Sequence, residues 1–150
     1  MKLDGSIDIA APADAVWAVL VDPTDLAACV PGVSAVRQVD PTTFEGTVRA
    51  SVGPLDGDFS FRSVTTRADF PADLVVDVEG TDSITRSRVL AHVEAALTET
   101  ASGTTLTYRA TVTTKGRLAI IGDMVLRATA GVMIGQVTRC LRDRLEAAPR

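Results

Sequence analysis

Residues 116–135 read GRLAIIGDMVLRATAGVMIG, and this stretch is the main evidence for the fold. Its apolar residues recur with helical spacing but are too many for the single stripe of an ordinary surface helix. Gly122, Gly131 and Gly135 interrupt it, and each costs roughly 0.5–1 kcal/mol relative to alanine inside a helix. The pattern predicts a helix over residues 118–146 that the rest of the chain wraps. Its glycines would leave room for a close backbone approach or for a guest molecule.

The alternative interpretation of this stretch is a membrane span, and two charges argue against it. Asp123 and Arg127 would each cost about 2.5–3.5 kcal/mol at the centre of a bilayer. No other window approaches the ~20 apolar residues that a span needs. The amino-terminal residues include Asp4 and lack an apolar core of signal-peptide length. We therefore expect a soluble, cytoplasmic protein, with peripheral contact at the inner face of the cell membrane as an open alternative.

The composition is that of one aliphatic domain. At 150 residues the chain predicts a single domain over 1–150 with a substantial core. Hydrophobic residues make up 46% but aromatic residues only 4%, so the core is built from Val, Ala, Leu and Ile. The net charge of -4 argues against a nucleic-acid-binding protein.

The charge is unevenly distributed along the chain. From Lys115 onward there are seven Lys or Arg and three Asp or Glu, a net of +4, whereas the remainder carries -8. Arg139, Arg142 and Arg144 crowd the end of the last predicted helix. They either compensate the helix dipole and aid solubility or form a contact face for anionic lipid or an acidic partner.

Two cysteines, Cys29 and Cys140, lie far apart and form no CxxC motif. With a single histidine in the chain, a zinc site lacks ligands. The sequence therefore predicts no metal site. Both cysteines are expected to be buried small hydrophobic residues in a reducing compartment.

Upstream of the long helix, the period of the apolar pattern predicts mainly strands. Residues 2–10 alternate as a half-buried strand, Pro12 suits the first turn of a helix, and Asp22 or Thr24 can cap a second short helix that runs through 26–30. A period of two then predicts six strands joined by tight turns, over residues 33–39, 44–52, 56–66, 74–79, 89–98 and 106–113.

This order of elements predicts an α+β helix-grip fold. A curved antiparallel sheet of about seven strands wraps around the long C-terminal helix, and two short helices follow the first strand. A strongly curved sheet of this kind rarely closes perfectly on its helix, so we expect a pocket between them.

Few side chains suggest catalysis. His92, the only histidine, alternates onto the solvent side of its strand. Tyr108 is predicted to point inward, either as a core tyrosine or as a ligand anchor. Asp123 and Arg127 are spaced i, i+4 and are expected to form an ion pair. If the pair is buried, it could orient the polar head group of a ligand. If it is exposed, it contributes little. The other inward positions are aliphatic, aromatic or glycine, which suits holding an apolar molecule. We predict no catalytic residue.

Three segments resemble one known family. They are residues 1–32, with APxxxVW at 11–17, residues 39–59, with a VGP turn at 52–54, and residues 103–126, with a G.LA..G pattern at Gly116, Leu118, Ala119 and Gly122. In order and spacing they are similar to the G-subunit family of carbon monoxide dehydrogenase, within the START-like (SRPBCC) superfamily. The resemblance spans nearly the whole chain.

The resemblance implies an accessory protein of aerobic molybdenum hydroxylases such as carbon monoxide dehydrogenase. Family members are associated with linking that enzyme to the membrane and its quinone pool, and the fold generally encloses a hydrophobic ligand. An isoprenoid quinone such as menaquinone would satisfy both. No covalently bound cofactor is implied.

The leading hypothesis is thus a non-enzymatic carrier with a cavity between the sheet and the C-terminal helix. Its predicted ligand-binding residues are Val48, Phe59, Phe61, Val76, Tyr108, Met124, Val125 and Met133, and its predicted membrane or partner contacts are Arg139, Arg142 and Arg144. One alternative is a small cyclase or aromatase-type enzyme, which needs Tyr108 to converge with Asp123 or Arg127. The other is a ligand-free adaptor that uses the basic helix end.

Overall fold

The computed structural model describes residues 1–146. In chain order the elements are β1 (Lys2–Ile9), α1 (Ala13–Val21), α2 (Pro23–Ala27), β2 (Val33–Asp40), β3 (Thr43–Val52), β4 (Leu55–Asp69), β5 (Asp73–Asp82), β6 (Ser87–Thr100), β7 (Gly103–Lys115), α3 (Arg117–Ile120) and α4 (Asp123–Glu146). The seven strands form one antiparallel sheet in the order β1-β7-β6-β5-β4-β3-β2. The predicted α+β helix-grip fold is confirmed.

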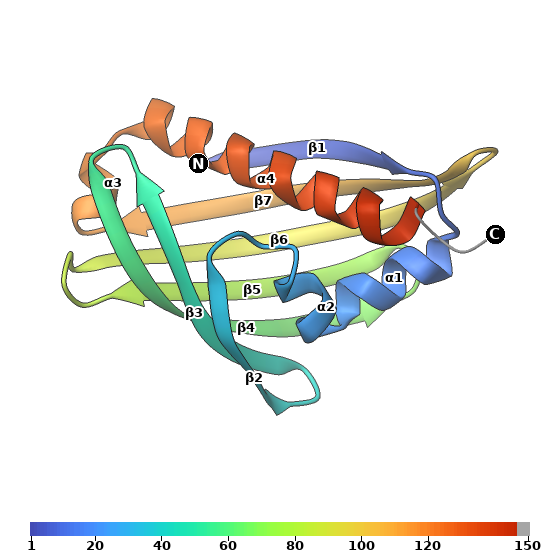
Figure 1. The fold of residues 1–150 in the computed structure, drawn as a ribbon, viewed down its shortest axis with the longest axis horizontal. Coiled ribbons are helices and arrows are strands. Elements are labelled where there is room, and N and C mark those ends of the chain that lie inside the picture. Colours follow the sequence, from blue (N-terminus) through green and yellow to red (C-terminus); the bar gives the residue numbers. More distant parts are fainter. Residues whose placement is uncertain (147–150) are drawn as a thin grey trace.

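The sheet curves around α4, which lies across its concave face (Figure 1). Strands β2 to β7 follow one another as hairpins, and β1 pairs with β7 so that Gly5 faces Tyr108. Along each strand the alternate apolar residues share the concave face, as the period of two predicts. The concave face is therefore apolar, and the convex face carries charged residues and threonines.

The long C-terminal helix differs from its prediction in two ways. It is not continuous from residue 118, because Gly122 adopts a φ of +101° and separates the short α3 from α4. The sheet covers only one side of α4, and the outer side of the helix is open to solvent, so the prediction that the rest of the chain wraps this helix holds for its inner side alone. Within residues 1–146, no helix is both long enough and apolar enough to span a bilayer.

Two separate hydrophobic clusters hold α4 to the sheet. The first, the disulfide-end cluster, joins β1, α1, β6, β7 and the last turns of α4 through Ile7, Ile9, Ala11, Ala13, Val16, Cys29, Leu97, Leu106 and Leu141. The second, the α3-end cluster, has Val52, Phe59 and Leu118 at its centre. The core is therefore divided between the two ends of the helix.

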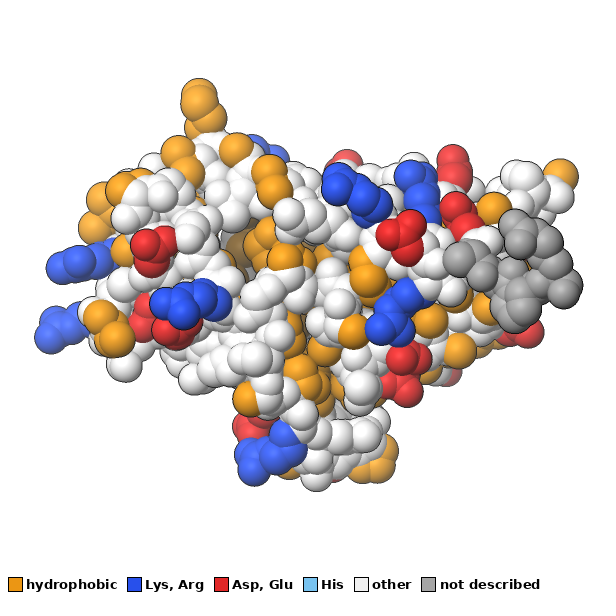
Figure 2. Space-filling model, in the orientation of Figure 1, with side chains coloured by type: hydrophobic (Ala, Val, Ile, Leu, Met, Phe, Trp, Pro, Cys, Tyr) orange, Lys and Arg blue, Asp and Glu red, His pale blue; other side chains and the backbone are white. Residues whose placement is uncertain are grey.

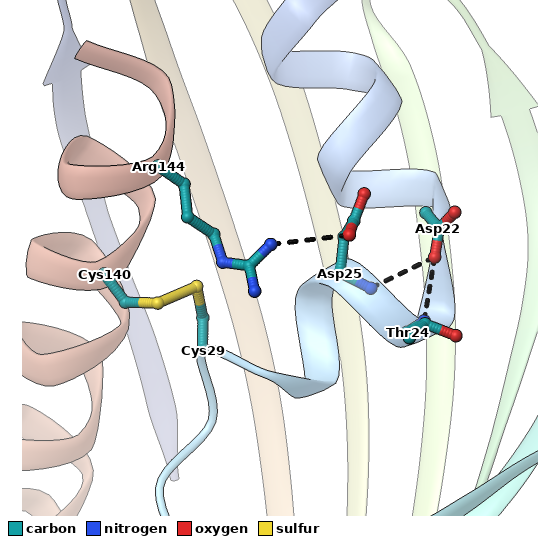
Figure 3. A network of polar contacts seen from close by, with 6 residues as sticks. All are labelled: Asp22, Thr24, Asp25, Cys29, Cys140 and Arg144. Atoms are coloured by element: carbon teal, nitrogen blue, oxygen red, sulfur yellow. Dashed lines mark hydrogen bonds and ion pairs between the residues drawn. A yellow bond between two sulfur atoms is a disulfide. The ribbon is translucent and has the colours of Figure 1, made fainter. Parts of the chain in front are cut away.

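A covalent clamp reinforces the disulfide-end cluster (Figure 3). Cys29, after α2, and Cys140, in α4, form a disulfide with their Cα atoms 5.4 Å apart. Arg144 of the same helix contacts Asp25 of α2 at 3.4 Å, and Asp22 caps α2 by accepting two backbone N–H bonds. The prediction of two unpaired thiols is wrong, because the fold brings together cysteines that are 111 positions apart.

Candidate functional site

The middle of the concave face belongs to neither cluster and is only half-buried. We call this region the trough. Its lining from the sheet is Phe44, Phe61, Val76, Val78, Ala91, Val93 and Val112, and its lining from α4 is Met133 and Ile134. Figure 2 shows apolar side chains inside a hollow between α4 and the β2–β3 arm. An apolar surface of this extent that stays in contact with water is typical of a binding site.

The trough exists because α4 crosses the sheet without packing closely against its central strands. Among the strands, α4 packs most closely against β1 and β3, which lie near opposite edges. Leu141 anchors one end and Val125 the other. Between them Met133 shares a helix face with Leu126 and Val137, at spacings of seven and four residues, yet remains partly exposed. The helix therefore lies over the central strands without burying them fully.

Aromatic rings that lie over glycines shape one wall of the trough. A Cβ on Gly46 would lie 2.9 Å from the ring of Phe61, so only glycine lets this ring lie flat on the sheet. Phe61 also packs edge-to-face with Phe44, their centroids 6.0 Å apart. Phe59 lies on the same face, as predicted, but is buried in the α3-end cluster. Phe61 thus lines the trough, whereas Phe59 belongs to the packed cluster at the α3 end of the trough.

Tyr108 supplies a phenol at the opposite wall. It packs against the disulfide-end cluster and stays half-buried. Its hydroxyl lies over the backbone of Gly5, where a Cβ would be only 2.6 Å from the oxygen. The predicted inward orientation is confirmed, and the hydroxyl is directed toward the edge strand β1.

The other predicted ligand-binding residues divide into three groups. Val76 and Met133 line the trough, and Val48 and Val125 pack in the α3-end cluster beside it. Met124 is 84% exposed, so the prediction that it lines the cavity is wrong. The reason is geometric: Val125 is turned toward the sheet, and successive helical residues are about 100° apart, which sends Met124 outward.

The glycines of α4 do not face the trough. Gly131 and Gly135 are exposed, and no atom lies within 4 Å of a Cβ placed on either one. The prediction that they accommodate a close backbone approach or a guest is therefore wrong. They sit on the outer side of the helix instead.

Asp123 and Arg127 form the predicted i, i+4 pair at 2.8 Å, and both side chains are exposed. Arg127 also donates to the backbone carbonyl of Lys2 at 2.9 Å, on the edge strand β1. The pair lies outside the trough, whereas Tyr108 lies on the concave face. The convergence of these groups that a cyclase or aromatase-type mechanism required is therefore not present.

His92 lies on the convex face, as predicted, between two carboxylates. Its Nδ1 is 2.6 Å from Asp77 and its Nε2 is 3.4 Å from Glu94. The hydrogen bond to Asp77, followed by the charges of both carboxylates, raises the pKa of His92 above its usual 6.5. A shallow hollow of about 350 Å³ beside it opens to solvent, on the other side of the sheet from the trough. In residues 1–146 no cluster of three metal-ligating side chains occurs.

The predicted basic contact face is partly used within the chain. Arg142 donates to the backbone carbonyl of Asp8 at 3.0 Å, and Arg144 pairs with Asp25. Arg139 is exposed. A contact role for these arginines stays a prediction.

Sequence reasoning missed Ile134 on α4 and five trough residues on the sheet, namely Phe44, Val78, Ala91, Val93 and Val112. All five occupy inward positions of the alternating strands. The missing information was the strand register, which aligns Phe44, Ser63, Val78, Ala91 and Val112 in one row across the sheet.

Comparison with known proteins supports this architecture. A family model described as the G subunit of carbon monoxide dehydrogenase (CoxG) matches residues 5–146. No curated protein sequence matches the chain.

Several solved structures share the fold. A conserved protein from Geobacillus kaustophilus superposes with a TM-score of 0.88 at 21% identity, covering 96% of this chain and 94% of that one. A START superfamily protein from Mycobacterium smegmatis gives 0.69 at 12% identity, covering 97% of each chain. Ara h 8.0201 gives 0.69 at 14% identity, covering 99% of each. At these identities the likeness establishes the START-like fold alone.

Proposed function

Because the chain belongs to the CoxG family of carbon monoxide dehydrogenase, we propose that it is a non-enzymatic carrier of an apolar lipid or isoprenoid quinone. Menaquinone is the guest that fits the family context best. The carrier would serve an aerobic molybdenum hydroxylase, such as carbon monoxide dehydrogenase, and link that enzyme to the membrane.

The trough is the observation that carries this proposal. A filled core would bury its aliphatic side chains, and each Å² of apolar surface removed from water is worth roughly 25 cal/mol. Here Val76, Val93 and Met133 are only partly buried although the sheet curves toward them. An isoprenoid or acyl chain would cover them, because such a chain is apolar, narrow and flexible enough to lie along a groove.

The proposed orientation of the guest follows from the polarity of the lining. Its apolar tail would lie against Val76, Val93 and Met133. Its head group would lie near Tyr108, whose hydroxyl can donate to a quinone or ester carbonyl. No paired titratable groups line the described part of the trough, which suits holding a molecule rather than transforming it.

Lipid extraction and mass spectrometry of the purified protein, followed by calorimetric titration with menaquinone, test the proposal. We expect a co-purified lipid or quinone, and saturable binding after its removal. Ala91→Phe, which places a ring in the trough, should abolish binding. Thr111→Phe is the matched control, because it places the same ring on the convex face of the neighbouring strand.

An empty protein that binds neither menaquinone nor other lipids would contradict the carrier proposal and favour the ligand-free adaptor. Equal binding by the Ala91→Phe and Thr111→Phe variants would show that the guest binds elsewhere.

A further inference from the structure

The end of the molecule that carries α3 exposes large apolar side chains. Ile84 is 87% exposed, Ile120 82% and Met124 84%, which makes them the three most exposed large hydrophobic residues in the described chain. Ile84 lies in the β5–β6 turn, and the other two lie in α3 and at the start of α4. These segments meet at the left-hand end in Figure 1. We call these three side chains the apolar tip.

The two segments are in direct contact. A Cβ on Gly116 would lie 1.7 Å from the carbonyl oxygen of Arg86, so the start of α3 is held against the β5–β6 turn. Gly116, with a φ of +75°, permits this approach. The β5–β6 turn and the start of α3 therefore present their apolar side chains at the same end of the molecule.

A buried polar network fixes the turn that presents Ile84. Asp82, 5% exposed, accepts a bond from the Ile84 backbone N–H at 2.9 Å and another from the Thr85 hydroxyl at 3.1 Å. The Thr85 oxygen lies 2.9 Å from that of Ser87, which in turn accepts from the Leu118 backbone N–H at 3.2 Å. The exposure of Ile84 is thus built into the fold.

Cations surround the apolar tip. Arg86, Lys115 and Arg117 are all exposed, and in the described part of the chain no carboxylate lies within ion-pair distance of any of them. Figure 2 shows basic and apolar side chains protruding together at this end. This local positive charge runs against the chain's net charge of -4. A negatively charged surface would be electrostatically complementary to this end of the molecule.

We propose that the apolar tip, with Arg86, Lys115 and Arg117 around it, docks on the surface of an anionic lipid bilayer. Aliphatic side chains on separate protrusions can each insert between head groups, while the cations contact phosphates. The surface lies at the opposite end of α4 from Arg139.

This docking surface adjoins the trough, so the inference extends the proposed carrier function and rests on it. The outer side of the α3–α4 junction carries Ile120 and Met124. Its inner side carries Leu118, Ile121 and Val125, which form part of the α3-end cluster that closes the trough. This cluster is therefore all that separates the docking surface from the trough.

Cosedimentation with vesicles of phosphatidylcholine, with and without phosphatidylglycerol, tests the proposal. We expect binding that needs phosphatidylglycerol and weakens with added salt. An Ile84→Ser/Ile120→Ser/Met124→Ser variant should lose about tenfold or more in apparent affinity. So should an Arg86→Glu/Lys115→Glu/Arg117→Glu variant, because each cation near an anionic surface contributes severalfold.

Control variants show where on the protein the contact with the vesicle lies. Val21→Ser/Val39→Ser removes exposed apolar side chains away from the tip, and Arg139→Glu reverses a charge at the other end of α4; both should bind vesicles like the unaltered protein. Circular dichroism checks the folding of every variant. The single variants Ile84→Ser and Arg117→Glu, which should each weaken binding severalfold, serve if a triple variant fails to fold.

Absence of vesicle binding, binding that the tip variants retain, or loss only with Arg139→Glu would each overturn the proposal. So would cross-linking of the tip to the partner hydroxylase in place of lipid. Menaquinone titration without vesicles separates this proposal from the carrier function. Docking with an empty trough would contradict only the carrier function, whereas quinone binding without docking would contradict only the tip.

Discussion

The two halves of α4 differ in how they are held. The C-terminal half is fixed to the rest of the chain: Leu141 is 1% exposed, Cys140 is in a disulfide, and Arg142 and Arg144 reach other elements. The N-terminal half is attached through Val125 in the α3-end cluster and through Arg127 on the carbonyl of Lys2, and it faces water on its outer side with Met124, Gly131 and Val132. The difference indicates that one half of the helix provides stability, while the other is free to present a surface and roof a trough.

The largest effect is expected when the disulfide at the C-terminal half of α4 is removed. The variant Cys29→Ser/Cys140→Ser should lower the free energy of unfolding by about 4 kcal/mol, because the disulfide closes a long loop in the unfolded chain. Urea unfolding measures the change. A reducing agent should destabilise the unaltered protein similarly and leave the variant unaffected; equal stability of the two proteins would contradict the disulfide.

Truncating single side chains of α4 to alanine should show the same difference between the two halves. Leu141→Ala should cost about 3 kcal/mol, because the residue is buried in the disulfide-end cluster. Met133→Ala should cost about 1 kcal/mol or less, because its side chain is already partly in water. Urea unfolding of both variants provides the comparison. Equal losses would mean that the trough is packed like a core.

Substituting the exposed glycines in the middle of α4 should raise the stability instead of lowering it. Gly131→Ala/Gly135→Ala should raise the free energy of unfolding by about 1–2 kcal/mol, because the added methyl groups meet nothing and alanine is the better helix former. Gly122→Ala is the control and should destabilise, since its φ of +101° strains any L side chain. If the double variant were less stable, a neighbour would have to lie against the outer side of α4.

The smallest effect is expected on the convex face, outside both halves of the helix. The pKa of His92 is raised by its hydrogen bond to Asp77, so protonated His92 stabilises the fold below pH 6.5. This contribution should be lost as the pH rises through the folded-state pKa. Melting temperatures of the protein and of His92→Gln should therefore differ in acid and converge at higher pH. A constant difference across that range would contradict the assignment.

Local patterns predicted much of this architecture. The alternation of Val89, Val93 and Leu97 predicted a strand and its inward face, and Asp22 was one of the two residues predicted to cap a second short helix. His92 was assigned to the solvent face by the same alternation. These features depend on residues near one another in the chain, so the sequence contains the information that determines them.

Other features depend on residues that are distant in sequence. The pattern of residues 116–135 could not reveal that α4 rests near the sheet edges, leaving the trough below and Met124 exposed above. It also could not reveal that the backbone of Arg86, after the β5–β6 turn, would lie against Gly116 at the start of α3, because two long strands separate these segments in sequence.

Local periodicity and short motifs were therefore enough to predict the strands, the alternation of their faces, the curved sheet with a helix across it, and the family. The Cys29–Cys140 pairing, the separation of the core into two clusters, and the place where apolar and basic side chains meet became visible only in three dimensions. The physical reason is that packing between distant segments sets the position and rotation of a helix. Since successive residues of a helix are turned by about 100°, that rotation settles whether a side chain faces the sheet or the water.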